Sequence, residues 1–224
     1  EEPVCKEFAF IKEMARIGGL STTIQQYRRD AWEAYQSLKM PTSKDEAWRR
    51  TDLQRLPADE FHLPERNQYL DLTPLPGDLM KPVADKEHGG IVLLMPGGAQ
   101  ASLSKPLTDQ GVVFTNLQTA EKQHPQIIDR VIGKVVRPAE GKFAALAGAL
   151  ADTGLLLYIP RGVKLTQPLH SILWGPGMGL AHISHLIIWL EEGASATYVH
   201  EYASPNEEKS SFHAGIVEIY VGQG

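Results

Sequence analysis

The chain has 224 residues, of which 42% are hydrophobic, so it can bury the core of one large globular domain or two small ones. Its net charge of −5, without a run of basic residues, argues against a protein that binds nucleic acid or an anionic membrane surface. The single cysteine, Cys5, excludes an internal disulfide, and no apolar run approaches the roughly 18 residues that span a bilayer. The simplest interpretation is a protein of the reducing cytoplasm.

A helical N-terminal region is predicted over residues 1–56. Apolar side chains at helical spacing indicate a first helix over residues 7–17. A longer amphipathic helix begins at the capping-box pattern of Thr22 and ends before Pro41, and a short helix after it carries Trp48.

The middle of the chain divides into a linker and an α/β segment. Residues 57–90 contain five prolines and are predicted to form an extended, irregular linker. Residues 91–154 are predicted to be an intermediate α/β segment that leads into the C-terminal part. Its predicted elements are two strands and two helices, over residues 91–95, 112–115, 125–136 and 143–150.

The C-terminal part, residues 155–224, contains one eight-residue pattern three times. The copies are LLLYIPRG at 155–162, LIIWLEEG at 186–193 and VEIYVGQG at 217–224. Their spacing is constant, because 186 − 155 and 217 − 186 both equal 31. A fixed period of this length is typical of proteins built from stacked repeats, and the alternating pattern of each copy predicts a parallel stack of strands.

Side chains alternate across a strand, so every second position of the repeat faces the same side. One set of positions is aliphatic in all three copies and is expected to point inward, with Leu157, Ile188 and Ile219 in one buried stack. The opposite face carries an aromatic column, Tyr158, Trp189 and Tyr220. We expect the N-terminal part of the chain to cover this column; a surface for a partner protein is the alternative.

These patterns predict a mixed fold, in which the helical N-terminal region precedes a parallel β-helix core whose first rungs are residues 155–224. A β-helix that stopped at Gly224 would expose an open strand edge. We therefore expect the core to be cut short here and the sequence to be part of a longer protein.

Two pairs of polar residues follow the same period. His182 and His213 are 31 residues apart, and so are His170 and Glu201, so the repeat places each pair on adjacent strands. Neighbouring strands are about 4.8 Å apart, which would let the two histidines of the first pair share a metal ion. The ordinary interpretation is a stack of half-exposed polar side chains, with the second pair in a cross-strand contact.

A metal site at the histidine pair would need further ligands, and His185 and His200 are the available candidates. His182 and His185 are similar to the paired histidines of a cupin, but their spacing of three puts them on opposite faces of a strand. The glycine-rich segments lack the pattern of a phosphate-binding loop, and no GxSxG nucleophile motif occurs. No residue is therefore assigned a catalytic, cofactor-binding or metal-binding role.

Four segments resemble the SufB/SufD family of iron–sulfur cluster assembly proteins. They are 45-DEAWRRTDL-53, 143-FAALAGALADTGLLLYIPRGVKLTQPL-169, 186-LIIWLEEGASATYVHEY-202 and 216-IVEIYVGQG-224. The resemblance extends over most of residues 43–224. It favours the SufD branch over the SufB branch because of the first segment and the single cysteine near the start of the chain.

The resemblance implies a right-handed parallel β-helix and a non-catalytic scaffold subunit that acts with a SufB-like subunit and a SufC-like ATPase in the cytoplasm. No cofactor is evident in this chain; an iron–sulfur cluster or iron would belong to the full complex, and a homodimer is left open. The parts of the family that bind SufC or handle clusters lie further toward the C-terminus, so no site is transferred to a numbered residue here. The alternative function is a metal-dependent enzyme of cupin-like or β-helix type that uses the histidine and glutamate columns.

Overall fold

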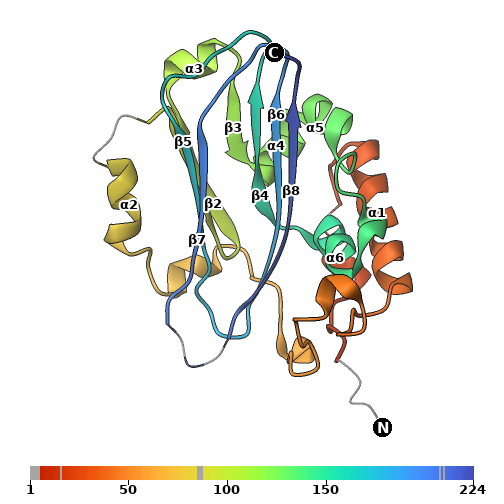
Figure 1. The fold of residues 1–224 in the computed structure, drawn as a ribbon. Coiled ribbons are helices and arrows are strands. Elements are labelled where there is room, and N and C mark those ends of the chain that lie inside the picture. Colours follow the sequence, from red (N-terminus) through yellow and green to blue (C-terminus); the bar gives the residue numbers. More distant parts are fainter. Residues whose placement is uncertain (1–5, 16, 85–87, 207, 209) are drawn as a thin grey trace.

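The computed structural model describes residues 6–15, 17–84, 88–206, 208 and 210–224, so Cys5 lies outside the described residues. Two four-stranded sheets form the centre, and helices flank them (Figure 1). The first sheet has the strand order β2-β1-β5-β7, with β1 at Gly90–Met95, β2 at Gly98–Leu103, β5 at Leu169–Trp174 and β7 at Tyr198–Ala203. The second sheet has the order β3-β4-β6-β8, with β3 at Val113–Asn116, β4 at Thr153–Ile159, β6 at Ala181–Leu190 and β8 at Phe212–Val221.

The α-helices of the described residues are α1 (Thr22–Ser37), α2 (Gly77–Ala84), α3 (Lys105–Asp109), α4 (Leu117–Gln123), α5 (Pro125–Val131) and α6 (Lys142–Leu150). Short 3-10 helices lie at Lys12–Met14 (η1), Glu46–Trp48 (η2), Ala58–Glu60 (η3), Gln68–Asp71 (η4) and Pro138–Glu140 (η5). Within the described part of the chain, no helix is long and apolar enough to cross a membrane.

From β5 onward, each strand lies in the other sheet from the strand before it. The neighbouring strands β4, β6 and β8 pair in parallel in the second sheet, as do β1, β5 and β7 in the first sheet. The strands β2 and β3 pair antiparallel with β1 and β4, at the edges opposite β7 and β8. The protein therefore has a mixed α/β fold with parallel sheets that each end in one antiparallel strand.

The 31-residue period is confirmed in the second sheet. Tyr158 pairs with Trp189, and Trp189 pairs with Tyr220. The glycines that close the first two copies, Gly162 and Gly193, have φ angles of 73° and 69°. A residue with a Cβ atom is strained in this left-handed region, so the recurrence of glycine has a conformational cause.

The first sheet has a period of 29 residues rather than 31, because Leu169 pairs with Tyr198. Nine residues, 160–168, connect β4 to β5, whereas seven residues, 191–197, connect β6 to β7. The shorter connection brings β7 into the first sheet two residues earlier than the pattern of the second sheet predicts.

The connections that follow restore the register. Six residues, 175–180, connect β5 to β6, and eight residues, 204–211, connect β7 to β8. The connection before β7 is two residues shorter than its counterpart before β5, and the connection after β7 is two residues longer than its counterpart after β5. The two differences cancel, so β8 pairs with β6 at the spacing of 31 residues, with Ala181 opposite Phe212.

The space between the two sheets is filled mainly by aliphatic side chains. Its buried residues include Val92, Leu94, Leu155, Leu157, Ile159, Leu169, Leu173, Leu186 and Ile188. Leu157 and Ile188 are 0% and 4% exposed, as the column predicts. Ile219 in the same column is 54% exposed, so the predicted stack is wrong at its third member. The reason is that β7 and β8 are edge strands of the described sheets, and no further described strand covers this part of β8.

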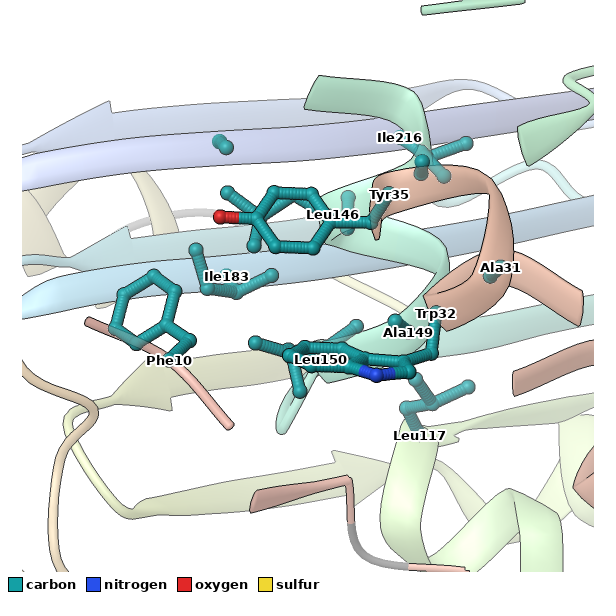
Figure 2. Packing of buried hydrophobic residues seen from close by; sticks show 14 of the residues in the cluster. Phe10, Ala31, Trp32, Tyr35, Leu117, Leu146, Ala149, Leu150, Ile183 and Ile216 are labelled. Atoms are coloured by element: carbon teal, nitrogen blue, oxygen red, sulfur yellow. The ribbon is translucent and has the colours of Figure 1, made fainter. Parts of the chain in front are cut away.

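The opposite face of the second sheet packs against α1 and α6. Figure 2 shows part of this layer, with Ile183 and Ile216 of the sheet near residues of both helices. Small side chains on α6 let this helix approach α1 closely. A Cβ atom at Gly148 of α6 would lie 2.9 Å from Tyr27 Oη and 3.1 Å from Ala31 Cβ of α1. The buried helix face and the buried sheet face together form the larger apolar cluster of the described residues.

The aromatic column is contacted by α5, so the predicted cover from within the same chain is confirmed, although α5 belongs to the middle of the chain rather than to its N-terminal part. The guanidinium of Arg130 lies 4.5 Å from the ring centre of Trp189. Tyr220 Oη donates a hydrogen bond of 2.7 Å to the carbonyl oxygen of Val131. All three aromatic side chains are half-buried. Trp189 and Tyr220 contact α5 through a ring face and a hydroxyl, whereas the ring of Tyr158 packs edge-on against Trp189, with centroids 5.1 Å apart.

The helix predicted over residues 7–17 is wrong, because η1 is the only helix among the described residues of this range. Phe8 and Phe10 are both buried, and their rings stack with centroids 5.2 Å apart. Two residues separated by two positions share one face of an extended chain, not of a helix. The segment is therefore extended where it enters the core, and the prediction misassigned the period.

The segment 57–90, predicted to be extended and irregular, contains η3, η4 and α2, so that prediction is wrong for its helical parts. The other predicted helices and strands are found, most of them with shifted ends. The strands at 91–95 and 112–115 and the helix at 143–150 are confirmed as β1, β3 and α6. The long helix after Thr22 is confirmed as α1, although Ser21 caps it through a hydrogen bond from Ile24 N. The helix predicted over 125–136 ends at Val131, because the next backbone N–H groups bind a buried carboxylate of the second sheet.

Candidate functional site

The space between the sheets becomes polar toward the start of β6. The inward positions of β6 change from Ile188 and Leu186 to Ser184 and then His182, and the last two are 2% and 3% exposed. Ser171 on β5 is 0% exposed. We call this group the interior polar cluster; its members are Ser171, His182, Ser184, Tyr198, His200, Tyr202 and His213. The side chains of His200, Tyr202 and His213 lie on the edge strands β7 and β8 and are exposed in the described chain.

His182 is the member of the cluster whose hydrogen bonding is incomplete. Its Nε2 atom is buried and has no hydrogen-bond partner among the described residues. Burial lowers the pKa of His182 to about 4, with a smaller contribution from the neighbouring His213, so the imidazole is neutral at pH 7. His182 and His213 pair in register on β6 and β8, which confirms the predicted histidine column.

Two further imidazoles reach the cluster from β7 and β8. His213 Nε2 lies 2.9 Å from Ser184 Oγ, and its ring stacks on Tyr202 with centroids 4.7 Å apart. His200 Nδ1 lies 2.8 Å from Ser171 Oγ. Burial lowers the pKa of both His200 and His213, so these imidazoles also favour the neutral form.

The cluster contains hydrogen-bond donors and acceptors without formal charge. Its two serine–histidine contacts have the distance of a nucleophile and its base, but the hydroxyls of Ser171 and Ser184 are buried from solvent, so no substrate can reach them. Across the ranges that the structure describes, no group of three or more His, Cys, Asp or Glu residues could hold a metal ion. The geometry therefore gives the metal-dependent alternative no ligand set in these residues.

Acid should destabilise the protein through His182. This imidazole has a pKa near 6.5 in the unfolded chain and near 4 in the folded chain. Its contribution to the free energy of unfolding is therefore fully present above pH 6.5 and is lost as the pH falls toward 4. We expect His182 alone to lower the free energy of unfolding by about 3 kcal/mol across this interval. Urea denaturation at several pH values, followed by circular dichroism, measures the loss.

The control for this experiment is a pair of variants. His182→Leu removes the titrating group, so the free energy of unfolding should depend less steeply on pH between 6.5 and 4. His62→Gln changes an exposed histidine and should keep the wild-type slope. Parallel slopes for wild type and His182→Leu would contradict the burial of a neutral imidazole.

His170 and Glu201, the second pair that follows the 31-residue period, are not paired in the structure. His170 pairs with Val199, and Glu201 pairs with Ile172, so the predicted contact between His170 and Glu201 is wrong. The short connection before β7 shifts this strand by two residues and separates the pair. The 31-residue spacing was measured on strands of the second sheet and does not apply to the first.

His185 faces the other side of β6 from His182, as the spacing of three predicts. Its Nε2 atom lies 2.8 Å from Glu218 Oε1, and both side chains are almost fully buried beneath the helices. Two histidines close in sequence therefore belong to different environments, and the cupin arrangement is absent from this strand.

Glu218 binds the segment that follows α5. Its carboxylate accepts hydrogen bonds from the backbone N–H groups of Gly133, Val135 and Val136, at 2.9, 3.0 and 3.2 Å. Burial by itself raises the pKa of Glu218, but the hydrogen bonds from His185 and Gly133 outweigh it and hold the pKa below its usual value. The repeat pattern does not predict this role, because Glu218 occupies a position that is aliphatic in the other two copies.

A second buried ion pair joins α1 to α4. Arg28 Nη2 lies 2.6 Å from Glu121 Oε1 and donates a hydrogen bond of 3.2 Å to the carbonyl oxygen of Ala151. Burial raises the pKa of Glu121, and Arg28 opposes this rise. Sequence analysis missed the pair, although Arg28 lies between Ile24 and Ala31 on the apolar face of its helix, which was the available signal.

Comparison with known proteins identifies similar sequences over most of the chain. A family model described as "SufBD protein N-terminal region" matches residues 13–170. The "Iron-sulfur cluster assembly protein SufD" of Bacillus subtilis is 29% identical over 206 residues, which are 89% of this chain and 46% of that protein.

Two further relatives match a shorter part. The "Iron-sulfur cluster assembly protein SufB" of Bacillus subtilis is 32% identical over 123 residues, which are 55% of this chain and 26% of that protein. An "Iron-sulfur cluster assembly SufBD family protein" of Staphylococcus epidermidis is 31% identical over 120 residues, which are 54% of this chain and 26% of that protein. The chain thus spans less than half the length of these curated relatives.

Proposed function

Because the chain belongs to the SufB/SufD family of iron–sulfur cluster assembly proteins, we propose that it is a non-catalytic scaffold subunit of a cytoplasmic assembly complex. The family match over residues 13–170 is the observation that carries this proposal. The similarity to SufD along 89% of the chain favours the SufD-like subunit, whose partners would be a SufB-like subunit and a SufC-like ATPase. Side chains fill the space between the sheets, which is consistent with a structural role.

The strand arrangement supports a right-handed parallel β-helix as the architecture of this scaffold. Parallel neighbours, strands that alternate between two sheets and inward aliphatic columns are all features of such a coil. On the same basis we propose the predicted division of the chain into a helical region, a linker, an intermediate segment and the first rungs, at residues 1–56, 57–90, 91–154 and 155–224.

Co-purification tests the assembly proposal. The whole protein, with an affinity tag, is co-expressed with its SufB-like and SufC-like partners and purified under anaerobic, reducing conditions. We expect both partners to elute with it in one size-exclusion peak of fixed stoichiometry. An unrelated ATPase of similar size, expressed in the same way, is the negative control. Elution of the tagged protein without either partner would contradict the proposal.

Metal analysis separates the scaffold from the metal-dependent alternative. The scaffold proposal predicts no stoichiometric zinc, iron or copper in the protein purified without its partners. The variants His182→Ala and His213→Ala serve as matched controls, because they remove the two histidines that pair on adjacent strands. Stoichiometric metal in the wild type that both variants lose would favour the enzyme instead.

A further inference from the structure

A polar pocket lies outside the interior polar cluster, where four distant segments of the chain meet. Its volume is about 450 Å³, within the range of small-molecule sites. The segment before η4, the β1–β2 turn, α4 and the start of β4 line it. The residues that matter for its chemistry are Arg66, Gly97, Thr119, Lys122, Asp152 and Thr153.

Backbone contacts make one wall of the pocket rigid. Asn67 N donates a hydrogen bond of 2.9 Å to Gly97 O, and Tyr69 N donates one of 3.1 Å to Pro96 O. A Cβ atom at Gly97 would lie 1.6 Å from the carbonyl oxygen of Glu65, so only glycine permits this approach. The segment that carries Arg66 is therefore fixed against the turn between β1 and β2.

The opposite wall is fixed by side-chain hydrogen bonds. Asn116 Oδ1 accepts a hydrogen bond of 2.9 Å from Thr119 N at the start of α4. Gln118 Nε2 donates one of 2.8 Å to the carbonyl oxygen of Asp152, which joins α4 to the start of β4. Lys122 follows on the same helix. The pocket is thus formed in advance by groups whose positions do not depend on a ligand.

Two positive charges of the pocket have no negative partner. Among the described residues, neither Arg66 nor Lys122 takes part in an ion pair, whereas Lys105, Lys142 and Arg161 each lie within 3.1 Å of a carboxylate oxygen. A guanidinium and an ammonium that both line one pocket favour an anionic group, and phosphate suits them because it accepts several charge-assisted hydrogen bonds.

We propose that this pocket binds a small phosphate monoester that also carries hydroxyl groups. Arg66 and Lys122 bind the phosphate oxygens. Thr119 and Thr153 line the same pocket, as does Asp152. The threonine hydroxyls both donate and accept hydrogen bonds, so they suit hydroxyl groups that the ligand carries beside its phosphate. The proposal is independent of the assembly partners.

Isothermal titration calorimetry of the whole protein with ribose 5-phosphate tests the proposal. Ribose and inorganic phosphate are the matched probes, because each carries one half of the required chemistry. We expect measurable binding of ribose 5-phosphate, weaker binding of phosphate and none of ribose. Absence of binding up to about 10 mM ribose 5-phosphate would overturn the proposal, as would equal affinity for inorganic phosphate.

Variants locate the site. Arg66→Gln and Lys122→Gln should each raise the dissociation constant about tenfold or more, because each removes a charge-assisted contact with phosphate. Their melting temperatures without ligand should match wild type, since neither side chain makes an ion pair that supports the fold. Arg55→Gln removes an exposed charge outside the pocket and should leave binding unchanged. Equal weakening in all three variants would show bulk charge attraction and overturn the assignment.

Discussion

Replacing Ile188 with aspartate should lower the free energy of unfolding by about 3–5 kcal/mol. Ile188 is 4% exposed and lies between the two sheets, in the same column as the fully buried Leu157. The variant would place a carboxylate among aliphatic side chains with no positive group beside it, and it would also lose the packing of the isoleucine. Urea denaturation followed by tryptophan fluorescence and circular dichroism measures the change.

The same substitution at Ile219 is the matched control. Ile219 pairs with Ile188 and occupies the next position of the same column, but it is 54% exposed. An aspartate there remains in solvent, so the free energy of unfolding should change by no more than about 0.5 kcal/mol in the described chain. Equal losses for the two variants would contradict the burial assigned to the column.

Replacing Glu218 with alanine should cost about 3–5 kcal/mol of stability. Glu218 is 0% exposed and is the acceptor for three backbone N–H groups and for His185. The variant removes the acceptor of all four groups at once and leaves the buried His185 and three partly buried backbone N–H groups without it. It should also loosen the segment after α5, so hydrogen exchange at Gly133 and Val135 should accelerate. Chemical denaturation and amide exchange measure the two effects.

Two other substitutions calibrate the Glu218 result. Glu218→Gln preserves the shape and one carbonyl acceptor, so its loss should lie between wild type and Glu218→Ala. Glu192→Ala removes an exposed ion pair with Arg161, whose charged atoms are 3.0 Å apart, and should cost less than about 1 kcal/mol. A cost for Glu218→Ala as small as that for Glu192→Ala would show that the buried hydrogen bonds are replaced by water.

The parallel stacking of the strands could be predicted because the same eight-residue pattern occurs three times at a constant spacing. The aliphatic and aromatic columns of the second sheet follow from one period, and the structure pairs Tyr158, Trp189 and Tyr220 as that period requires. The cover of the aromatic column was also predictable, since three neighbouring aromatic rings exposed to water would be unfavourable. Each of these predictions depends on local alternation and needs no knowledge of the rest of the chain.

The predictions that failed depend on information that alternation does not contain. Phe8 and Phe10 are extended because the core offers a place for both rings, a tertiary effect that overrides local helical spacing. Ile219 has the sequence of a buried residue, and its exposure depends on whether another strand lies beside β8. A side chain's burial is decided by its neighbours in space, which the repeat specifies only where a further strand exists.

The candidate site was predicted in part. The pairing of His182 with His213 followed from the period, but Ser184, which contacts His213, and Ser171, which contacts His200, were not singled out. Their signal was present as serine at inward positions of otherwise aliphatic strands. The hydrogen bonds between Glu218 and Gly133 and between Arg28 and Glu121 connect residues more than 80 positions apart. A local pattern can mark a buried polar residue, as at Arg28, but it does not reveal the distant partner.

The unequal connections between the strands imply a rule for how this architecture tolerates insertions. One repeat has nine and six residues outside its strands and the next has seven and eight, so both contain fifteen. A change of two residues in one connection is therefore compatible with the second sheet when the next connection changes by the opposite amount. The total length of the connections is the same in both 31-residue repeats, while its division between the two connections differs. A single unmatched insertion would shift the faces of every later strand only when its length is odd, because alternation repeats every two residues.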